Sequence, residues 1–132
     1  MDKEMQEKIK QVLAEKNRFI MANNFRLLEL EEDHCVLEGI ITESSLNPYG
    51  TVHGGYFFGL ADTAGGTIAR MSGGNPVTSS ANIVFLHKAK GTRLVAIAKP
   101  LKRGKTLTIC EVEIFDDQEK MVAKATMEYF NL

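Results

Sequence analysis

The sequence predicts an α+β domain in which one long buried helix packs against an antiparallel sheet of about six strands. Residues 54–69 form a helical pattern that is apolar on nearly every side, and Asp62 is the only charged residue in it. Six runs with strand patterns, separated by turn residues, account for most of the remaining chain. No linker, repeat or low-complexity segment divides the chain, so we expect a single domain over residues 1–132.

The chain begins with a predicted amphipathic helix over about residues 2–21. Apolar residues recur there near helical spacing, with Lys and Glu between them: Met5, Ile9, Val12, Leu13 and Ile20. The polar side is mixed in sign and lacks the basic bias and bulky aromatic edge of helices that lie on lipid. We therefore expect this helix to lie on the core of the domain and not on a membrane.

The first two predicted strands, Phe25 to Glu31 and Cys35 to Thr42, form a hairpin around a charged turn, and we expect His34 to lie on the surface of that turn. Four more strands are predicted after the central helix: Val77 to Leu86, Leu94 to Leu101, Thr106 to Phe115 and Met121 to Phe130. Their short connections favour antiparallel neighbours. Cys35 and Cys110 lie in strand patterns without metal-ligand spacing, which predicts two buried free thiols.

The composition, 44% hydrophobic and 25% charged, is that of an ordinary soluble domain. No run approaches the ~20 apolar residues that span a bilayer, and the N-terminus lacks the apolar segment of a secretory signal, so we expect a cytoplasmic protein. Residues 63–110 contain basic residues but no acidic ones, which indicates either a surface that attracts an anionic ligand or a solvated face whose acidic balance lies elsewhere in the chain. Phe85 is the only aromatic residue there, so a small phosphorylated ligand fits better than nucleic acid.

The residues at the start of the central helix could bind a negative charge. Asn47-Pro48-Tyr49-Gly50 is typical of a turn, and His53-Gly54-Gly55 of a helix opening. The first N–H groups of a helix have no partner within it, and the helix dipole adds positive charge, so a developing negative charge could be held there. Asp62 lies two turns deeper, where a carboxylate away from water needs a partner or has a function.

Small residues share one side of this helix with the acid. Gly55, Gly59, Asp62 and Gly66 recur at i, i+4, i+7 and i+11. Glycine is unfavourable in a helix interior, so this stripe indicates a close approach by a second chain or a thin ligand, or simply tight packing in the core.

The run Asn47-x-x-Gly50-x-x-His53-Gly54-Gly55, followed by Asp62, resembles the signature of hotdog-fold acyl-CoA thioesterases of the phenylacetate-degradation (PaaI-like) type. The resemblance extends from about Phe25 to Phe130. It implies a long central helix wrapped by an antiparallel sheet, and a dimer, paired again into a homotetramer, with sites between two chains. It implies no metal and no separate cofactor, since coenzyme A is part of the substrate.

The resemblance also implies catalytic roles. Asp62 would activate water or attack the thioester itself, and Gly55, with Gly54 beside it, would polarise the thioester carbonyl. Asn47 would orient the water or the carbonyl, although Asn-Pro is also an ordinary turn starter. His53 would shape the helix entry.

Three further groups would contact the substrate. The hydroxyl of Thr78, Ser79 or Ser80 would hold the nucleophilic water. Alternatively, all three are only polar residues at the start of a strand. Basic residues would meet the nucleotide end of coenzyme A, unless they form an ordinary charged hairpin: Lys102, Arg103 and Lys105. An aromatic residue would line the acyl pocket, with Tyr56 as the candidate and Phe57 and Phe58 as its alternatives.

The sequence therefore predicts an acyl-CoA thioesterase for an aryl or a short to medium acyl group. A hotdog hydratase or dehydratase is the first alternative, but such enzymes need a His paired with Glu or Asp at the site. A non-catalytic acyl-CoA binding module is the second. The acyl group itself is left open by the sequence.

Overall fold

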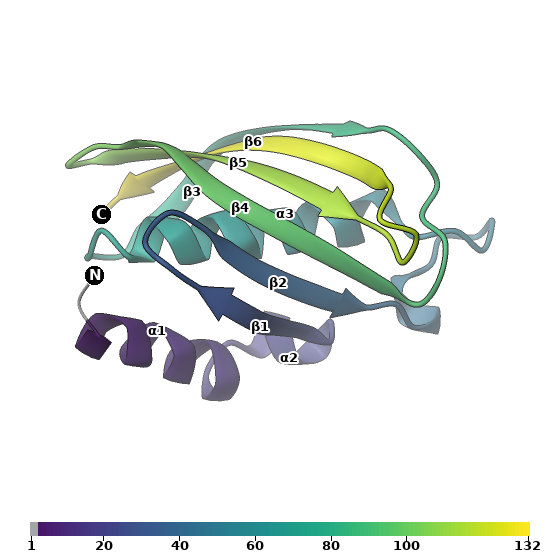
Figure 1. Ribbon diagram of the computed structural model, residues 1–132, viewed down its shortest axis with the longest axis horizontal. Coiled ribbons are helices and arrows are strands. Elements are labelled where there is room, and N and C mark those ends of the chain that lie inside the picture. The colour runs from purple at the N-terminus through teal and green to yellow at the C-terminus, as the bar shows by residue number, and fades with distance from the viewer. Residues whose placement is uncertain (1–2) are drawn as a thin grey trace.

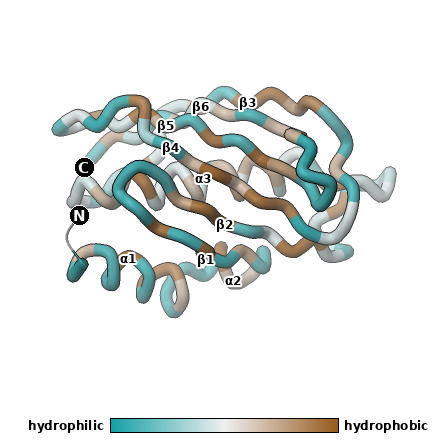
Figure 2. The backbone as a smooth tube through the Cα atoms, in the orientation of Figure 1, coloured by the Kyte–Doolittle hydropathy of each residue, from teal (hydrophilic) through white to brown (hydrophobic). Residues whose placement is uncertain are grey.

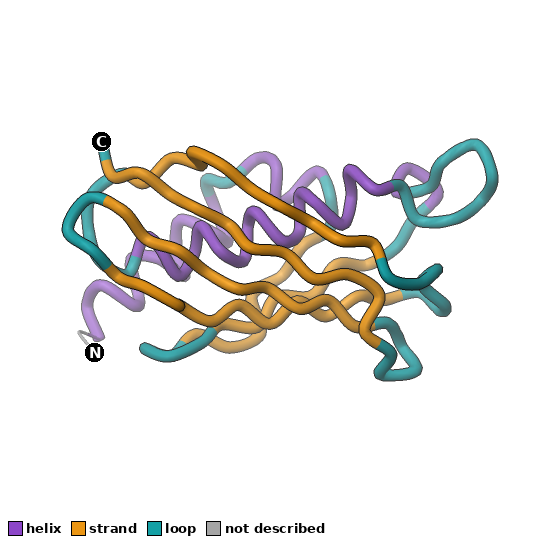
Figure 3. The backbone as a smooth tube through the Cα atoms, turned by 90° about the horizontal axis from the view of Figure 1, so that it is seen from above, coloured by secondary structure: helices purple, strands orange, loops and turns teal. Residues whose placement is uncertain are grey.

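The central helix, α3 (Gly54–Arg70), lies along one face of a six-stranded sheet in the computed structural model (Figure 1). The structure describes residues 3–132. Each predicted strand overlaps one observed strand: β1 (Phe25–Leu30), β2 (Cys35–Ile40), β3 (Pro76–Phe85), β4 (Arg93–Arg103), β5 (Leu107–Phe115) and β6 (Met121–Asn131). Seen from above, the strands curve beside the helix along its whole length (Figure 3). The predicted α+β class is confirmed.

The strands are ordered β1-β2-β4-β5-β6-β3, and every neighbouring pair is antiparallel. Pairing of consecutive strands, as predicted, holds for β1 with β2, β4 with β5 and β5 with β6. It is wrong for β3 and β4, because β3 pairs with β6 at the edge and β4 pairs with β2. Residues 86–92, when extended, reach roughly 20 Å, which exceeds the roughly 14 Å across three strand spacings.

The core lies between α3 and the inner face of the sheet. In β5 and in residues 93–98 of β4, buried inward residues alternate with half-buried ones, as expected for a sheet with one covered face, whereas the rest of β4 is mostly exposed. Figure 2 shows hydrophobic segments along the central strands and hydrophilic turns at their ends. The helix buries Leu60, Ala61, Ala64 and Ile68 completely against this face. Its other side is only half-buried in the single chain, which differs from the prediction of a helix buried all round.

The N-terminal segment forms two helices, α1 (Lys3–Glu15) and α2 (Arg18–Ala22), where the sequence predicted one over about residues 2–21. The break arises at Asn17, whose side-chain oxygen accepts a hydrogen bond from Ile20 N at 3.1 Å and so starts a new helix. Residue 2 lies outside the described residues. Ile9, Leu13 and Ile20 are buried, which confirms that these helices lie on the core. Within residues 3–132 no helix has the length and apolar character needed to cross a membrane.

Both cysteines are buried free thiols, as predicted. Cys35 Sγ donates to the carbonyl of Ala64 in α3 at 3.2 Å, and Cys110 Sγ donates to that of Gly65 at 3.6 Å. Burial raises the pKa of each thiol to about 12. Both sulfurs therefore stay protonated at neutral pH and pack as small apolar groups under the helix.

Strand β3 differs from the rest of the sheet because both of its faces are largely exposed in the single chain. Among its ten residues only Pro76 and Ile83 are even half-buried, and Val84 and Phe85 are 51% and 52% exposed. Its outer edge has no partner strand within the described chain. A short helical turn, η1 (Glu43–Ser45), and residues 46–53 connect β2 to the N-terminal end of α3.

Candidate active site

Asp62 faces β3 and β6 from the middle of α3. Its Oδ1 accepts a hydrogen bond from Thr78 Oγ1 at 2.7 Å and a longer one from Tyr129 Oη at 3.1 Å. The carboxylate is half-buried and lies in a cavity of about 510 Å³ between α3, the N-terminal helices and β3. The sequence placed this acid inside the protein. In the single chain it lies instead in an open cavity, because the sheet covers only one side of the helix.

The pairing of β3 with β6 explains why Thr78 is the hydroxyl that reaches the acid. Thr78 lies opposite Tyr129, whereas Ser80 lies opposite Glu128, so Ser79 is the extra residue of a β-bulge. The Ser79 hydroxyl instead donates to the Glu128 carbonyl and carboxylate at 3.2 and 3.1 Å. Ser80 is exposed. Of the three hydroxyls that the sequence left open, Thr78 is thus the one brought to Asp62.

Tyr129 is a part of this site that the sequence analysis missed. Its hydroxyl also lies 2.8 Å from the backbone carbonyl of Asp62, and only 2% of the residue is exposed. Burial, together with the nearby Asp62 carboxylate, raises the pKa of Tyr129, so the phenol remains a donor. The signal was the alternation of β6, in which Ala125, Met127 and Tyr129 point inward.

The helix entry forms a second group of predicted residues. The Asn47 side chain is held within its own turn: Nδ2 donates to Thr51 Oγ1 at 2.7 Å, and Oδ1 accepts from the N–H groups of Tyr49 and Thr51 at 2.9 and 3.1 Å. His53 is the N-cap of α3, and its Nδ1 accepts from Gly55 N at 2.8 Å. His53 and Gly55 are exposed, and Asn47 is half-buried. All three lie at one end of the helix.

Within one chain these two groups of residues do not meet. Asp62 lies seven positions after Gly55 in the α-helix, which corresponds to about 10 Å along the axis. A second cavity, of about 500 Å³, opens beside the helix entry and is bounded by Gly54, Phe57, Phe85 and the segment 86–89. The carboxylate and the helix entry therefore face separate cavities.

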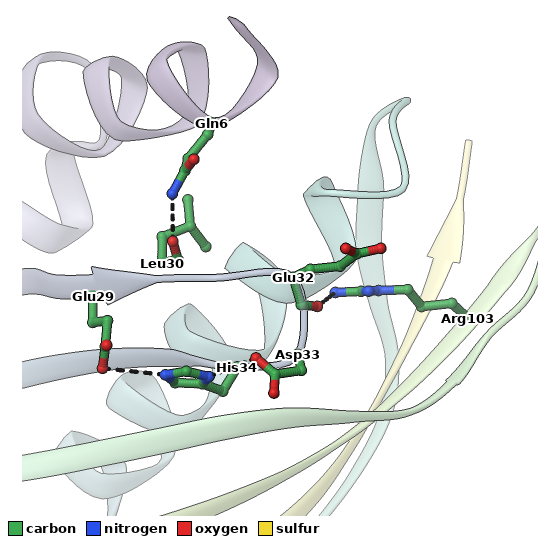
Figure 4. A network of polar contacts seen from close by, with 7 residues as sticks. All are labelled: Gln6, Glu29, Leu30, Glu32, Asp33, His34 and Arg103. Carbon is green, nitrogen blue, oxygen red and sulfur yellow. Dashed lines mark hydrogen bonds and ion pairs between the residues drawn. The ribbon is translucent and has the colours of Figure 1, made fainter. Parts of the chain in front are cut away.

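The basic turn between β4 and β5 lies beside the turn between β1 and β2 (Figure 4). Lys102, Arg103 and Lys105 are exposed, and Arg103 Nη2 donates to the carbonyl of Glu32 at 2.5 Å. Lys102 and Lys105 thus carry positive charge at the surface of this end of the sheet.

His34 lies in the same network and is more constrained than a surface turn residue. Its Nδ1 is 2.8 Å from an Asp33 oxygen and its Nε2 is 3.1 Å from a Glu29 oxygen. The hydrogen bonds to Asp33 and then Glu29 raise the pKa of His34. In Figure 4, Gln6 of α1 also donates to the carbonyl of Leu30, which ties the N-terminal helix to β1.

The model of the thioesterase superfamily matches residues 49–123, which include His53, Gly55, Asp62 and Thr78 and begin two residues after Asn47. The chain belongs to this superfamily. A putative esterase of Deinococcus radiodurans is 38% identical over 94 residues, which cover 70% of this chain and 64% of that protein. The match thus spans slightly less than two thirds of that relative. The acyl-coenzyme A thioesterase PaaI of Escherichia coli is 33% identical over 98 residues, 74% of this chain and 70% of PaaI.

Comparison with solved structures extends the similarity from the matched segment to nearly the whole of this chain. The E. coli PaaI structure superposes with a TM-score of 0.91 at 25% identity, over 98% of this chain and 94% of PaaI. A hypothetical thioesterase of Streptococcus pneumoniae TIGR4, solved with coenzyme A, gives a TM-score of 0.81 at 28% identity, over 86% of this chain and 91% of that one. The hotdog fold and the PaaI-like resemblance are confirmed, and with them the assignment to thioester hydrolases at the level of the family.

The last predicted site residue is the aromatic side chain that was expected to line the acyl pocket. Tyr56 is buried in the core, where its hydroxyl donates to the carbonyls of Asn23 and Ile40 at 2.7 and 2.9 Å, and it lines neither of the two cavities. Phe57 borders the cavity at the helix entry. Among residues 3–132 no group of three or more His, Cys, Asp or Glu side chains is placed to hold a metal ion.

Proposed function

We propose that the protein is an acyl-CoA thioesterase that hydrolyses an aryl or a short to medium acyl-CoA to the free acid and coenzyme A. The observation that carries this proposal is a carboxylate, Asp62, held by Thr78 in a cavity on the central helix of a thioesterase-superfamily chain. A cavity of about 510 Å³ is in the usual range for small-molecule sites, which suits an acyl group of this size.

Asp62 directs the attack on the thioester. Both side-chain hydrogen bonds fall on Oδ1, and within residues 3–132 no protein donor binds Oδ2. Oδ2 is then the oxygen that accepts a proton from water as the water oxygen attacks the carbonyl carbon. The tetrahedral intermediate collapses with cleavage of the C–S bond, and the thiolate of coenzyme A leaves. In the other form of this mechanism, Oδ2 attacks the carbonyl itself and water cleaves the resulting anhydride.

The entry of α3 stabilises the negative charge that develops on the carbonyl oxygen. The N–H of Gly54 has no acceptor in the described part of the chain, and the N–H of Gly55 is bound to His53 Nδ1. A substrate oxygen would replace this imidazole nitrogen, so His53 keeps the Gly55 donor in place until substrate binds. Asn47 fixes the turn that precedes it through three hydrogen bonds.

The complete site needs two chains. Because Gly55 and Asp62 of one helix are about 10 Å apart, a thioester that contacts both groups is best served by Asp62 of one chain and the helix entry of its partner. The uncovered β3, with an unpaired edge and exposed Val84 and Phe85, is a suitable surface for such a dimer. We expect two dimers to pair into a tetramer.

Coenzyme A binds with its phosphates near the basic turn. Lys102, Arg103 and Lys105 present exposed cations there, which suit phosphate oxygens. The S. pneumoniae thioesterase, solved with coenzyme A, supports a ligand of this class. A non-catalytic acyl-CoA binding module would share this feature but has no need of a held carboxylate. A hydratase or dehydratase would need a His paired with an acid at the site. Within the described chain no histidine borders the Asp62 cavity, but the helix entry of a partner chain would bring its own N-cap histidine there, so the products formed from an enoyl-CoA must separate the two activities.

Thiol release tests the proposal. Wild type and Asp62→Asn are assayed side by side with aryl, short-chain and medium-chain acyl-CoAs, and an enoyl-CoA is added to detect hydration. We expect wild type to release thiol from at least one substrate and the variant to lose this activity. Binding without hydrolysis by the wild type would establish the binding module, and hydration of the enoyl-CoA without thiol release would establish the hydratase.

A further inference from the structure

We propose that Tyr129 is a positioning residue for Asp62, which fixes Oδ1 so that Oδ2 points to the reacting water. This inference rests on the proposed thioesterase function. Tyr129 comes from β6, the strand farthest along the chain, and its hydroxyl reaches both the backbone carbonyl of Asp62 at 2.8 Å and Oδ1 at 3.1 Å. It therefore fixes the acid at two points with a single, shared proton.

The carboxylate needs such support because its last torsion is soft. Rotation about the terminal bond of an Asp side chain has broad, roughly two-fold preferences, so the two oxygens readily exchange places. Thr78 Oγ1 alone, at 2.7 Å, would anchor Oδ1 from one direction. The hydroxyl of Tyr129 adds a donor from a second strand, and two donors on one oxygen hold the plane of the carboxylate.

Gly65 provides the space through which the tyrosine reaches the helix. A Cβ at this position would lie 2.4 Å from Tyr129 Oη and 3.0 Å from the ring, which is closer than real Cβ contacts. A glycine in a helix interior costs about 1 kcal/mol relative to alanine. Because residue 65 has no side chain, the Tyr129 hydroxyl can contact the backbone of the helix. Any larger residue at this position would displace the hydroxyl.

A purely structural role is the alternative, because a buried phenol requires a hydrogen-bond partner in any case. Tyr56 supplies a matched comparison. It too is a buried tyrosine, 6% exposed against 2% for Tyr129, and its hydroxyl also donates to backbone carbonyls, those of Asn23 and Ile40. Tyr56 has no contact with Asp62, so only Tyr129 couples the loss of a buried hydroxyl to the carboxylate.

The test compares Tyr129→Phe with Tyr56→Phe in the full-length protein, using the best acyl-CoA of the panel. Each variant loses one buried hydroxyl, so both are expected to show similarly lowered melting temperatures. We expect Tyr129→Phe to lower kcat about 10- to 100-fold with KM within about twofold, the range for a lost hydrogen bond to a charged group. Tyr56→Phe is expected to keep kcat within about twofold of wild type.

The same substitution in an Asp62→Asn background separates positioning from general damage. If Tyr129 acts through Asp62, Tyr129→Phe causes no further loss from the residual rate of Asp62→Asn. An unchanged kcat in folded Tyr129→Phe, or an equal loss with and without Asp62, overturns the proposal. Should Tyr129→Phe fail to fold, Gly65→Ala displaces the hydroxyl while retaining it, and the same loss of kcat is expected. A wild type that releases no thiol overturns the proposed function itself, and the Tyr129 proposal with it.

Discussion

The two ends of the catalytic region on α3 are built in different ways. At the helix entry, the side chains of Asn47 and His53 bond to atoms within four residues of themselves. In the middle of the helix, Asp62 is held by partners 16 and 67 positions away in the sequence. A local motif thus fixes the donors for the substrate carbonyl, whereas the environment of the carboxylate depends on the packing of three elements.

The largest effect is expected at the carboxylate. Asp62→Asn keeps the shape of the side chain but removes the proton acceptor, so kcat should fall about 10²- to 10⁴-fold, the usual contribution of a general base. Steady-state thiol release measures this, and a circular dichroism spectrum like that of wild type shows that the fold is retained. Turnover close to wild type would remove Asp62 from the mechanism.

Thr78 tests the long-range part of the site. Thr78→Val removes the 2.7 Å hydrogen bond to Oδ1 at nearly constant volume, and we expect kcat to fall about 10-fold or more. Ser79→Ala and Ser80→Ala, whose hydroxyls do not contact Asp62, should keep kcat within about twofold. The same assay run on all three variants decides, and a loss confined to a serine variant would show that another hydroxyl serves the site.

Asn47 tests the local part. Asn47→Ala loses three hydrogen bonds of the entry turn, which should lower the free energy of unfolding by about 1 to 3 kcal/mol and kcat by about 10-fold. Urea unfolding and the thiol assay measure the two effects together. Lower stability with full activity would reduce Asn47 to a turn residue, in agreement with the simpler interpretation of Asn-Pro.

These two regions also differ in how much of their structure the sequence could predict. The buried helix, the strand alternation and the glycine-rich helix entry are local patterns, and they predicted the fold class and the family. The position of β3 beside β6, and with it the meeting of Thr78 with Tyr129, depends on strand order and on a bulge at Ser79. No local pattern contains the strand order, which is why three hydroxyls were left open. The alternation of β6 places Tyr129 on the inner face of the sheet, but it does not show that this residue meets Asp62.

The helix itself was predicted correctly but its surroundings were not. Its apolar circumference indicated burial on all sides, yet a single chain covers only the side that carries Leu60, Ala64 and Ile68. A partner chain would explain Phe58 and the small residues Gly59 and Gly66 on the other side, and a sequence pattern does not distinguish such a partner from the core of the same chain.

The smallest effect on activity is expected at Glu38, in β2 and remote from both groups. Burial alone would raise its pKa, but the hydrogen bond from Arg93 and the charge of Arg26 outweigh burial and lower it below the ordinary value of 4.5. The ion pairs therefore stabilise the fold fully above pH 4.5, and this contribution is lost as the pH falls through the lowered pKa.

Glu38→Gln should be less stable than wild type at neutral pH, and the difference should shrink below pH 4.5. Urea unfolding at a series of pH values measures this, with kcat at neutral pH unchanged in the folded protein. A difference in stability that is independent of pH would contradict the assignment of these ion pairs.

Complementation between Asp62→Asn, expected to be nearly inactive, and Asn47→Ala, expected to keep about a tenth of wild-type kcat, tests most directly whether one active site combines Asp62 of one chain with the helix entry of another. Asp62→Asn and Asn47→Ala chains are unfolded together, refolded as a mixture and assayed beside each variant refolded alone. Random pairing makes half of the dimers mixed, and each mixed dimer holds one intact site of two, so the account predicts about a quarter of wild-type activity. A mixture no more active than the average of the two variants, despite exchange of chains, would contradict it.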